Sequence, residues 1–315
     1  MNLAIPDVRT LEIHPANSGP ATSCRRSTGA GMRNELGVPL LKNAIRDSAR
    51  LGYNFLSIAG EQSLFYSDLT AICRQAHQMR MLTTLTTRAG LLSSRRIDSL
   101  IHSIDLLGIR YEAGMGGNLE PVQRAGIPFA LVYHLTAANM GELEPTASFA
   151  AAHGAAMLHV KPTEEMSDQN MATVWMMIEC LRDIYRGELA IQLDVVNRYN
   201  PRTDAVKLDT WLPKVMEDPT LLCEAISPLV VEEDGWVSPL RHGMPRSIGF
   251  GLLRESTLVE LAEAWIRHRA SGFCQRYTKV LEEAPLFGDL HQLLAEHEAR
   301  RSAFKVLPMK MATGL

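Results

Sequence analysis

Thr10-Leu11-Glu12-Ile13-His14 is an apolar, strand-like run that leads into a polar loop from Pro15 to Ser27. Further runs of this kind follow it along the chain, and amphipathic, helix-like segments lie between most of them. Such an alternation predicts a parallel sheet built from right-handed βαβ units. We therefore expect an α/β fold with a partial (β/α) barrel, in which functional residues follow the carboxyl ends of strands. The later runs are Phe55 to Ile58, Leu82 to Thr87, Ile104 to Ile109, Phe129 to Leu135, Met157 to Val160 and Leu189 to Val196.

The alternation of strands and helices stops after Val196. The polar stretch from Asn197 to Asp204 is rich in turn-forming residues and predicts a linker. Residues 227–240 then predict a hairpin whose turn is Asp234-Gly235, and amphipathic helices follow it. We expect a barrel over residues 1–196 and, over residues 197–315, a linker, a hairpin and C-terminal helices that form a small appendage.

Bulk composition excludes several classes of protein. The 315 residues are 46% hydrophobic and 21% charged, which is enough apolar material for a sizeable core. A net charge of -3 argues against a protein that tracks nucleic-acid phosphates. No run approaches the roughly 18 apolar residues of a membrane span, so we expect no membrane partner and a cytoplasmic location. The five cysteines are scattered, which favours neither a disulfide framework nor a C-x-x-C metal site.

The first strand, its His14-Pro15-Ala16-Asn17 turn and the loop that follows resemble the opening of the radical S-adenosylmethionine (AdoMet) enzymes, also called radical SAM enzymes. In that family C-x-x-x-C-x-x-C holds a [4Fe-4S] cluster. Here the three cysteine places are Gly19, Ser23 and Arg26, and a shift by one residue recovers only Cys24. Because the cluster needs protein thiolates, the resemblance implies a relative that has lost its cluster ligands.

The resemblance extends to the segments that cradle AdoMet in the family. Gly60-Glu61-Gln62-Ser63 stands where the family has G-G-E-P, and Glu61 places a bulky side chain where backbone would approach the ligand. Arg88 replaces the asparagine of a T-T-N-G signature, and Glu112 ends a segment similar to S-L-D-G. These residues form a predicted vestigial AdoMet cleft. Glu61 and Gln62 could bind a polar ligand there, or they could fill the space that AdoMet would occupy.

The predicted hairpin resembles the terminal SPASM-like segment of peptide-modifying radical AdoMet proteins, which often binds auxiliary clusters. No cysteine lies between Cys223 and Cys274, so we expect no auxiliary cluster here. Arg25, Arg26 and Arg88 would place positive charge at the mouth of the barrel, which suits an anionic ligand or an acidic peptide.

Two functions remain open from the sequence. The first is a pseudoenzyme without a cofactor, which acts as a binding or partner subunit for a protein or peptide in a peptide-modifying or other natural-product pathway. The second is a repurposed barrel enzyme with a mononuclear metal ion or another cofactor. Three histidines near predicted strand ends, with Asp194 nearby, would supply the ligands of such a metal: His14, His134 and His159.

Overall fold

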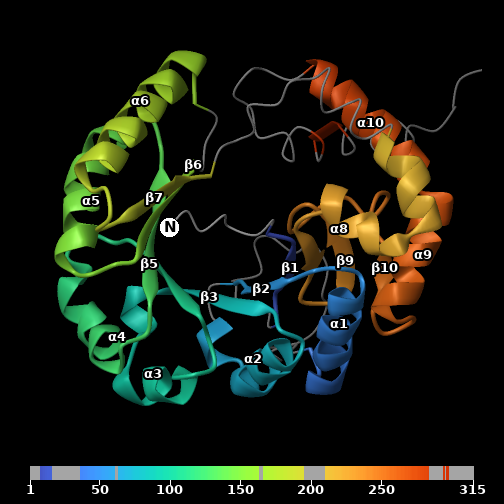
Figure 1. The fold of residues 1–315 in the computed structure, drawn as a ribbon, viewed down its shortest axis with the longest axis horizontal. Helices are drawn as coiled ribbons and strands as arrows, with labels where there is room; N and C mark the ends of the chain where they lie inside the picture. Colours follow the sequence, from blue (N-terminus) through green and yellow to red (C-terminus); the bar gives the residue numbers. More distant parts are fainter. Residues whose placement is uncertain are drawn as a thin grey trace, which may run out of the picture.

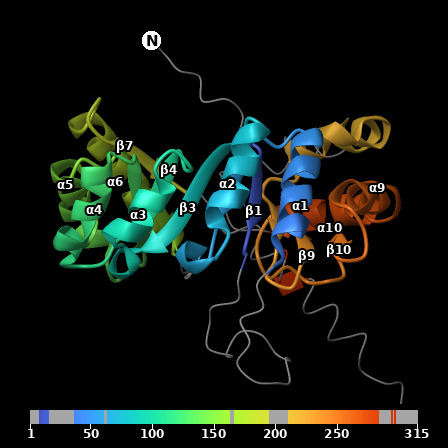
Figure 2. The same cartoon turned by 90° about the horizontal axis from the view of Figure 1, so that it is seen from below.

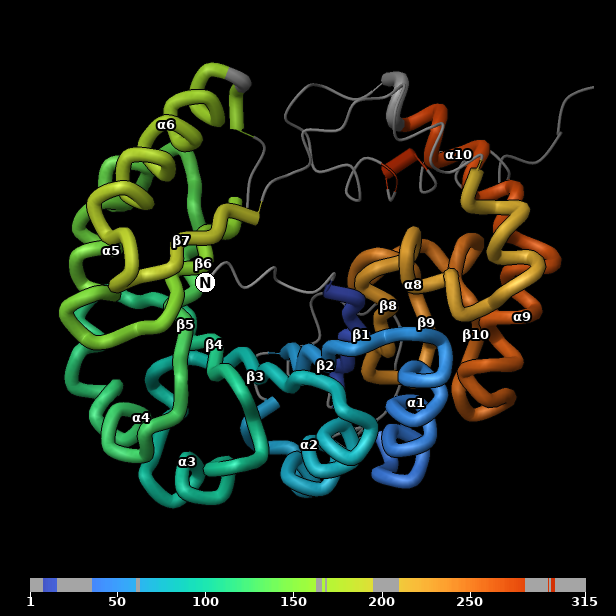
Figure 3. The backbone as a smooth tube through the Cα atoms, viewed as in Figure 1, coloured from blue at the N-terminus to red at the C-terminus, as the bar shows by residue number. Residues whose placement is uncertain are grey.

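One ten-stranded sheet organises the chain in the computed structural model, which describes residues 8–15, 36–60, 63–162, 166–194, 210–283, 294, 296 and 297. The strand order is β10-β9-β8-β1-β2-β3-β4-β5-β6-β7. Strands β1 to β7 run parallel to one another, as the alternation in the sequence predicts. The sheet curves, with helices on its convex side (Figure 1). Its end strands β7 and β10 do not pair in the described part of the chain, so the barrel is partial, as expected (Figure 3).

The parallel strands coincide closely with the predicted apolar runs. They are β1 (Thr10–Ile13), β2 (Phe55–Ile58), β3 (Leu82–Arg88), β4 (Leu106–Arg110), β5 (Phe129–Leu135), β6 (Met157–Pro162) and β7 (Ala190–Leu193). The helices between them are α1 (Val38–Arg50), α2 (Leu69–Gln78), α3 (Ser94–Leu100), α4 (Glu120–Ala125), α5 (Leu143–Ala152) and α6 (Asp168–Ile184).

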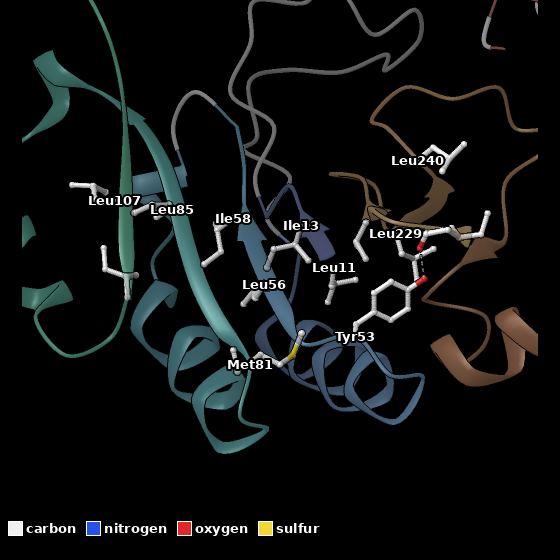
Figure 4. Close-up of a cluster of buried hydrophobic side chains, with 14 of the residues drawn as sticks. Leu11, Ile13, Tyr53, Leu56, Ile58, Met81, Leu85, Leu107, Leu229 and Leu240 are labelled. Carbon is white, nitrogen blue, oxygen red and sulfur yellow. Dashed lines mark hydrogen bonds between the residues drawn. The ribbon is translucent and has the colours of Figure 1, made fainter. Parts of the chain in front are cut away.

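The core lies between the sheet and these helices. Alternate strand residues such as Ile13, Ile58 and Leu85 are fully buried, and they form one continuous layer across neighbouring strands (Figure 4). The helices supply the other half of the layer, for example Ile45 and Ile72, which are also fully buried. Each buried side chain of this size contributes about 1.5–3 kcal/mol through loss of water contact, so this layer dominates the stability of the fold.

The expected hairpin is present, and it extends the same sheet. β8 (Leu229–Val231) pairs in parallel with β1, and β9 (Trp236–Pro239) and β10 (Gly251–Leu252) follow in antiparallel pairs. The Asp234 carboxylate accepts a hydrogen bond from the Trp236 backbone N–H at 2.9 Å, and Gly235 takes a φ of +86° to complete the turn. The C-terminal segment therefore packs edge to edge with the first strand.

The remaining helices lie beyond this end of the sheet. They include α8 (Leu222–Ala225), α9 (Leu258–His268) and α10 (Ala270–Glu283), and Figure 2 shows α9 and α10 from a second direction. Thr257 and Glu260 form a capping box that starts α9. The predicted linker and the boundary at residue 196 lie outside the described residues. None of the helices in the described ranges combines the length and apolar character that crossing a membrane requires.

Candidate functional site

The concave side of the sheet is polar. Side chains alternate between the two faces of a strand, so residues that follow Leu11, Ile13 and Leu85 by one position face away from the helices. Register aligns these residues across strands: Glu12 pairs with Ser57, and Ser57 pairs with Thr84. We call this surface the concave face. Its polar residues are Glu12, Ser57, Thr84, Thr86, Arg88, Arg110, His134, His159 and Lys161, all of intermediate exposure, and the buried Val132 and Val230 lie in the same registers.

Two histidines and two carboxylates gather where β1 and β8 end, and we call them the His14 cluster. The His14 backbone N–H donates to Val231 O at 2.9 Å, which fixes His14 beside β8. The Glu12 carboxylate contacts His14 Nε2 at 2.8 Å, and Glu233 Oε1 lies 3.9 Å from His14 Nδ1. Glu233 Oε2 contacts His242 Nε2 at 2.9 Å, and the two imidazole rings lie with centroids 4.3 Å apart at an interplanar angle of 35°. Four side chains from three segments thus meet at one point.

Hydrogen bonding sets the ionisation of the His14 cluster. Burial works to raise the pKa of Glu12, but its hydrogen bond with His14 and nearby positive charges bring that pKa below its ordinary value. The pKa of Glu233 is lowered in the same way, since its hydrogen bond with His242 and its backbone hydrogen bond outweigh burial. The hydrogen bond with Glu233 raises the pKa of His242 in turn. Both glutamates are therefore carboxylates near neutral pH.

Glu232 holds the segment that carries His242. Its buried carboxylate accepts hydrogen bonds from Ser238 Oγ at 2.5 Å and from the Gly243 backbone N–H at 3.1 Å. Leu240, between these two partners, takes a φ of +69°, which is uncommon for a residue with a side chain. The chain after β9 is thus turned back over β8, and this turn places His242 on His14.

A second group of charged residues lies at the ends of β4 to β7, and we call it the basic group: Arg110, His134, His159 and Lys161. Asp194 joins it after β7, with Oδ1 at 2.7 Å from His159 Nε2 and Oδ2 at 3.5 Å from Lys161 Nζ. Burial and the positive charges of Arg110, Lys161 and His159 lower the pKa of His134. Burial works to raise the pKa of Asp194. The contacts of its carboxylate with His159 and Lys161 outweigh burial, so this pKa is lowered. The Asp194 carboxylate therefore contacts both the His159 imidazole and the Lys161 ammonium group.

The curvature of the sheet brings the two groups within electrostatic range. The positive charge of Lys161 on β6 is among the causes that lower the pKa of Glu12 on β1, although four strands separate β1 from β6 in the sheet order. The concave face thus carries an acidic and histidine-rich end at β1 and a basic end at β4 to β6.

Several of the predicted site residues lie in the described part of the chain. Gly60 follows β2 beside His14, and a Cβ built on it would lie 3.9 Å from His14 Nδ1 and 3.1 Å from Ser63 Oγ. The Ser63 hydroxyl donates to the carbonyls of Ala59 and Gly60. Arg88 lies on the concave face, whereas Glu112 is exposed after β4 and its backbone N–H contacts Met115 Sδ. Gly19, Ser23, Cys24, Arg25, Arg26, Glu61 and Gln62 lie outside the described residues.

The structure divides the predicted metal ligands between the two groups. His159 and Asp194 are in contact, and His134 lies within electrostatic range of His159. His14 has its contacts with Glu12, Glu233 and His242. In the part of the chain that the structure describes, His14, Glu233 and His242 form the group whose ligand atoms all lie within 4.8 Å of one another. Glu233 and His242 were not predicted as ligands, although Glu233 lies within the predicted hairpin and His242 follows it.

The residues present do not fit a [4Fe-4S] cluster. Glycine has no donor side chain, serine offers a hydroxyl and arginine is a cation, so the donor set Gly19, Ser23 and Arg26 contains no thiolate. Of the cysteines in the described ranges, Cys73, Cys223 and Cys274 are buried and Cys180 is exposed on α6. Burial raises the pKa of the Cys73 thiol to about 12.

No protein-family model matches the chain, and no curated protein sequence matches it. Solved structures do match. SuiB from Streptococcus suis, bound to S-adenosylmethionine, is 12% identical with a TM-score of 0.58 over 84% of this chain and 65% of SuiB. SuiB bound to its precursor peptide SuiA is 11% identical with the same TM-score, over 84% of this chain and 66% of SuiB. The protein anSMEcpe with bound AdoMet and Kp18Cys peptide is 14% identical with a TM-score of 0.53, over 82% of each chain.

The fold resembles that of radical SAM enzymes. SuiB and anSMEcpe are both enzymes of this class. At these identities the likeness concerns the fold, and it confirms the predicted radical SAM-like α/β architecture. The chain spans slightly less than two thirds of the length of AdoMet-bound SuiB.

Proposed function

We propose that this chain is a radical SAM-like pseudoenzyme that binds an acidic peptide on its concave face, as a partner subunit in a peptide-modifying pathway. The observation that carries the proposal is the basic group at the ends of β4 to β6. His159 and Lys161 contact the carboxylate of Asp194, and Arg110, Lys161 and His159 lie within electrostatic range of His134. A carboxylate of a bound peptide would complete this arrangement with charge-assisted hydrogen bonds.

The polar concave face supports the same proposal. Ser57, Thr84 and Thr86 offer hydroxyl groups between the basic group and the His14 cluster. Hydroxyls and charged groups at the carboxyl ends of parallel strands are typical of binding sites in α/β folds. SuiB and anSMEcpe have each been solved with a peptide, which makes a peptide the first ligand class to test.

The donor set supports the pseudoenzyme part of the proposal. Anaerobic reconstitution with iron and sulfide is expected to give no cluster chromophore, because Gly19, Ser23 and Arg26 supply no thiolate. Calorimetric titration with AdoMet is expected to show no binding. A chromophore with about four irons per chain would contradict this part of the proposal.

Peptide binding is tested with short fluorescein-labelled oligoglutamate and oligolysine, followed by fluorescence anisotropy. Oligoglutamate is expected to bind more tightly, and its affinity is expected to fall as salt is added, because the attraction is between charges. Arg110→Ala and Lys161→Ala are each expected to weaken binding about tenfold, as for one charge-assisted hydrogen bond. Arg46→Ala, which removes an exposed arginine on the outer surface of α1, is the matched control. Equal binding of both peptides, or equal effects of all three substitutions, would contradict the proposal.

A further inference from the structure

We propose that His14, Glu233 and His242 form a binding site for one divalent transition-metal ion of the Zn²⁺ type. Two imidazole nitrogens and one carboxylate are a ligand set that zinc takes in catalytic sites, where a further position stays open to water or substrate. This ligand set shares only His14 with the set expected from the sequence. The proposed metal site does not depend on whether the basic group binds a peptide.

The spacing of the ligand atoms suits such an ion. The three ligand atoms all lie within 4.8 Å of one another, and His242 Nε2 already lies 2.9 Å from Glu233 Oε2. Bonds of about 2.0–2.1 Å around a tetrahedral zinc ion place its ligand atoms roughly 3.3 Å apart. His14 Nδ1 lies 3.9 Å from Glu233 Oε1, so these two ligand atoms would move closer together when the ion binds.

Glu12 completes the pattern of a metal-binding histidine. It accepts a hydrogen bond from His14 Nε2 at 2.8 Å, which directs the Nδ1 lone pair toward Glu233 and His242. A carboxylate on the far nitrogen of a ligand histidine fixes the tautomer and increases the basicity of the ligand. Glu12 is thus a positioning residue for the ion.

The backbone around the cluster is fixed and leaves space at the ligand atom. The His14 N–H bond to Val231 O ties β1 to β8, and Glu232 ties Gly243 beside His242. Because Gly60 has no Cβ, the position 3.9 Å from His14 Nδ1, where a Cβ would make an ordinary van der Waals contact, holds no side chain of this residue. The ligands therefore come from three separate segments that the sheet and these hydrogen bonds hold together.

The test uses full-length protein without a histidine tag, stripped with EDTA and titrated with Zn²⁺ by calorimetry. We expect one ion per chain, and Co²⁺ in its place is expected to give the intense visible bands of a low-coordinate nitrogen and oxygen site. His14→Ala, Glu233→Gln and His242→Gln are each expected to weaken binding by about a hundredfold or more, and Glu12→Gln by about tenfold to a hundredfold.

Two histidine–carboxylate pairs elsewhere provide matched controls. His77 contacts Asp105 at 3.1 Å and His159 contacts Asp194 at 2.7 Å, so His77→Ala and His159→Ala remove the same chemical group without touching the cluster. Both are expected to bind Zn²⁺ as the unchanged protein does. His242 is partly exposed, so His242→Gln is expected to fold normally, and a circular-dichroism melt checks this. Absence of Zn²⁺ binding by the unchanged protein, or binding that survives both His242→Gln and Glu233→Gln, would overturn the proposal.

Discussion

The two faces of the sheet differ in the polarity and the burial of their side chains. On the convex face, Leu11, Ile13, Leu56, Ile58 and Leu85 are fully buried beneath the helices. On the concave face, Glu12, Ser57, Thr84 and Thr86, which adjoin them in sequence, are polar or charged and of intermediate exposure. Both faces belong to the same strands, so the sequence alternates between two requirements at every second position.

This difference separates stability from binding. Apolar burial on the convex face holds the sheet and helices together, whereas polar side chains on the concave face contribute little to folding and are free to define a site. Substitutions on the two faces are therefore expected to affect different measurements, and the following predictions test that separation.

The largest effect is expected from Leu85→Ala on β3. Leu85 is fully buried between strands and helices, so its removal leaves a cavity and lowers the free energy of unfolding by about 2–5 kcal/mol. Thr84→Ala, one residue earlier and on the concave face, is expected to change it by less than about 1 kcal/mol. Urea-induced unfolding followed by circular dichroism measures both. Equal losses would show that the two faces contribute alike.

A backbone effect is expected at Gly60, next to His14 on the concave side. Its φ is +109° and a Cβ would approach Ser63 Oγ to 3.1 Å, so Gly60→Ala is expected to cost about 1–3 kcal/mol. Gly90, after β3, has open space around the position of a Cβ, and Gly90→Ala is the control with little expected change. A comparable loss at both glycines in urea unfolding would refute the steric explanation.

Glu232 is the exception to the separation, because it is a buried carboxylate with a structural role. Glu232→Ala leaves Ser238 Oγ and the Gly243 N–H without their acceptor, and a loss of about 1–3 kcal/mol is expected. The control is Glu263→Ala on the exposed side of α9. If Glu232→Ala is as stable as Glu263→Ala in thermal melts, Glu232 does not hold the turn.

The smallest effect is a pH dependence at Asp194. Its folded-state pKa lies below its ordinary value of 3.8, so the stabilisation is complete above that value and is lost as the pH falls through 3.8 toward the lowered pKa. Asp194→Asn is therefore expected to lower the melting temperature slightly at neutral pH and not at strongly acidic pH. Asp183→Asn, at an exposed aspartate on α6, is the control. A difference between Asp194→Asn and the unchanged protein that grows as the pH falls would contradict the assigned direction.

Much of the fold could be predicted because strand and helix periodicity are local properties. The apolar runs at 55–58 and 129–135 match β2 and β5 at both ends, and the Asp234-Gly235 turn is where the hairpin turns. Helix α5 has little sequence signal of its own, since Leu143–Ala152 is largely apolar and alanine-rich with weak periodicity. The pairing of β8 with β1 could not be predicted from the sequence, because no local pattern specifies which strands pair.

The candidate site was predicted in part for the same reason. His14 was recognised because it follows a strand-like run, Gly60 because its segment resembles the G-G-E-P segment of radical AdoMet enzymes, and Asp194 because it lies near the end of the last strand-like run. His242 and Glu233 were not, since their relation to His14 depends on the β1–β8 pairing and on the turn held by Glu232. Lys161 and Arg110 were missed because a charge at the end of a strand has no distinctive sequence pattern.

The sequence by itself determined the alternation of strands and helices, the polar and apolar faces of strands such as β1 and β3, and the lack of thiolates at Gly19, Ser23 and Arg26. These depend on residue identity and on periods of two or about 3.6 residues. Only the tertiary structure decided that His14, Glu233 and His242 meet, and that Lys161 lies within electrostatic range of Glu12. Strand order and sheet curvature are global properties, since they depend on how distant segments bury their apolar faces together.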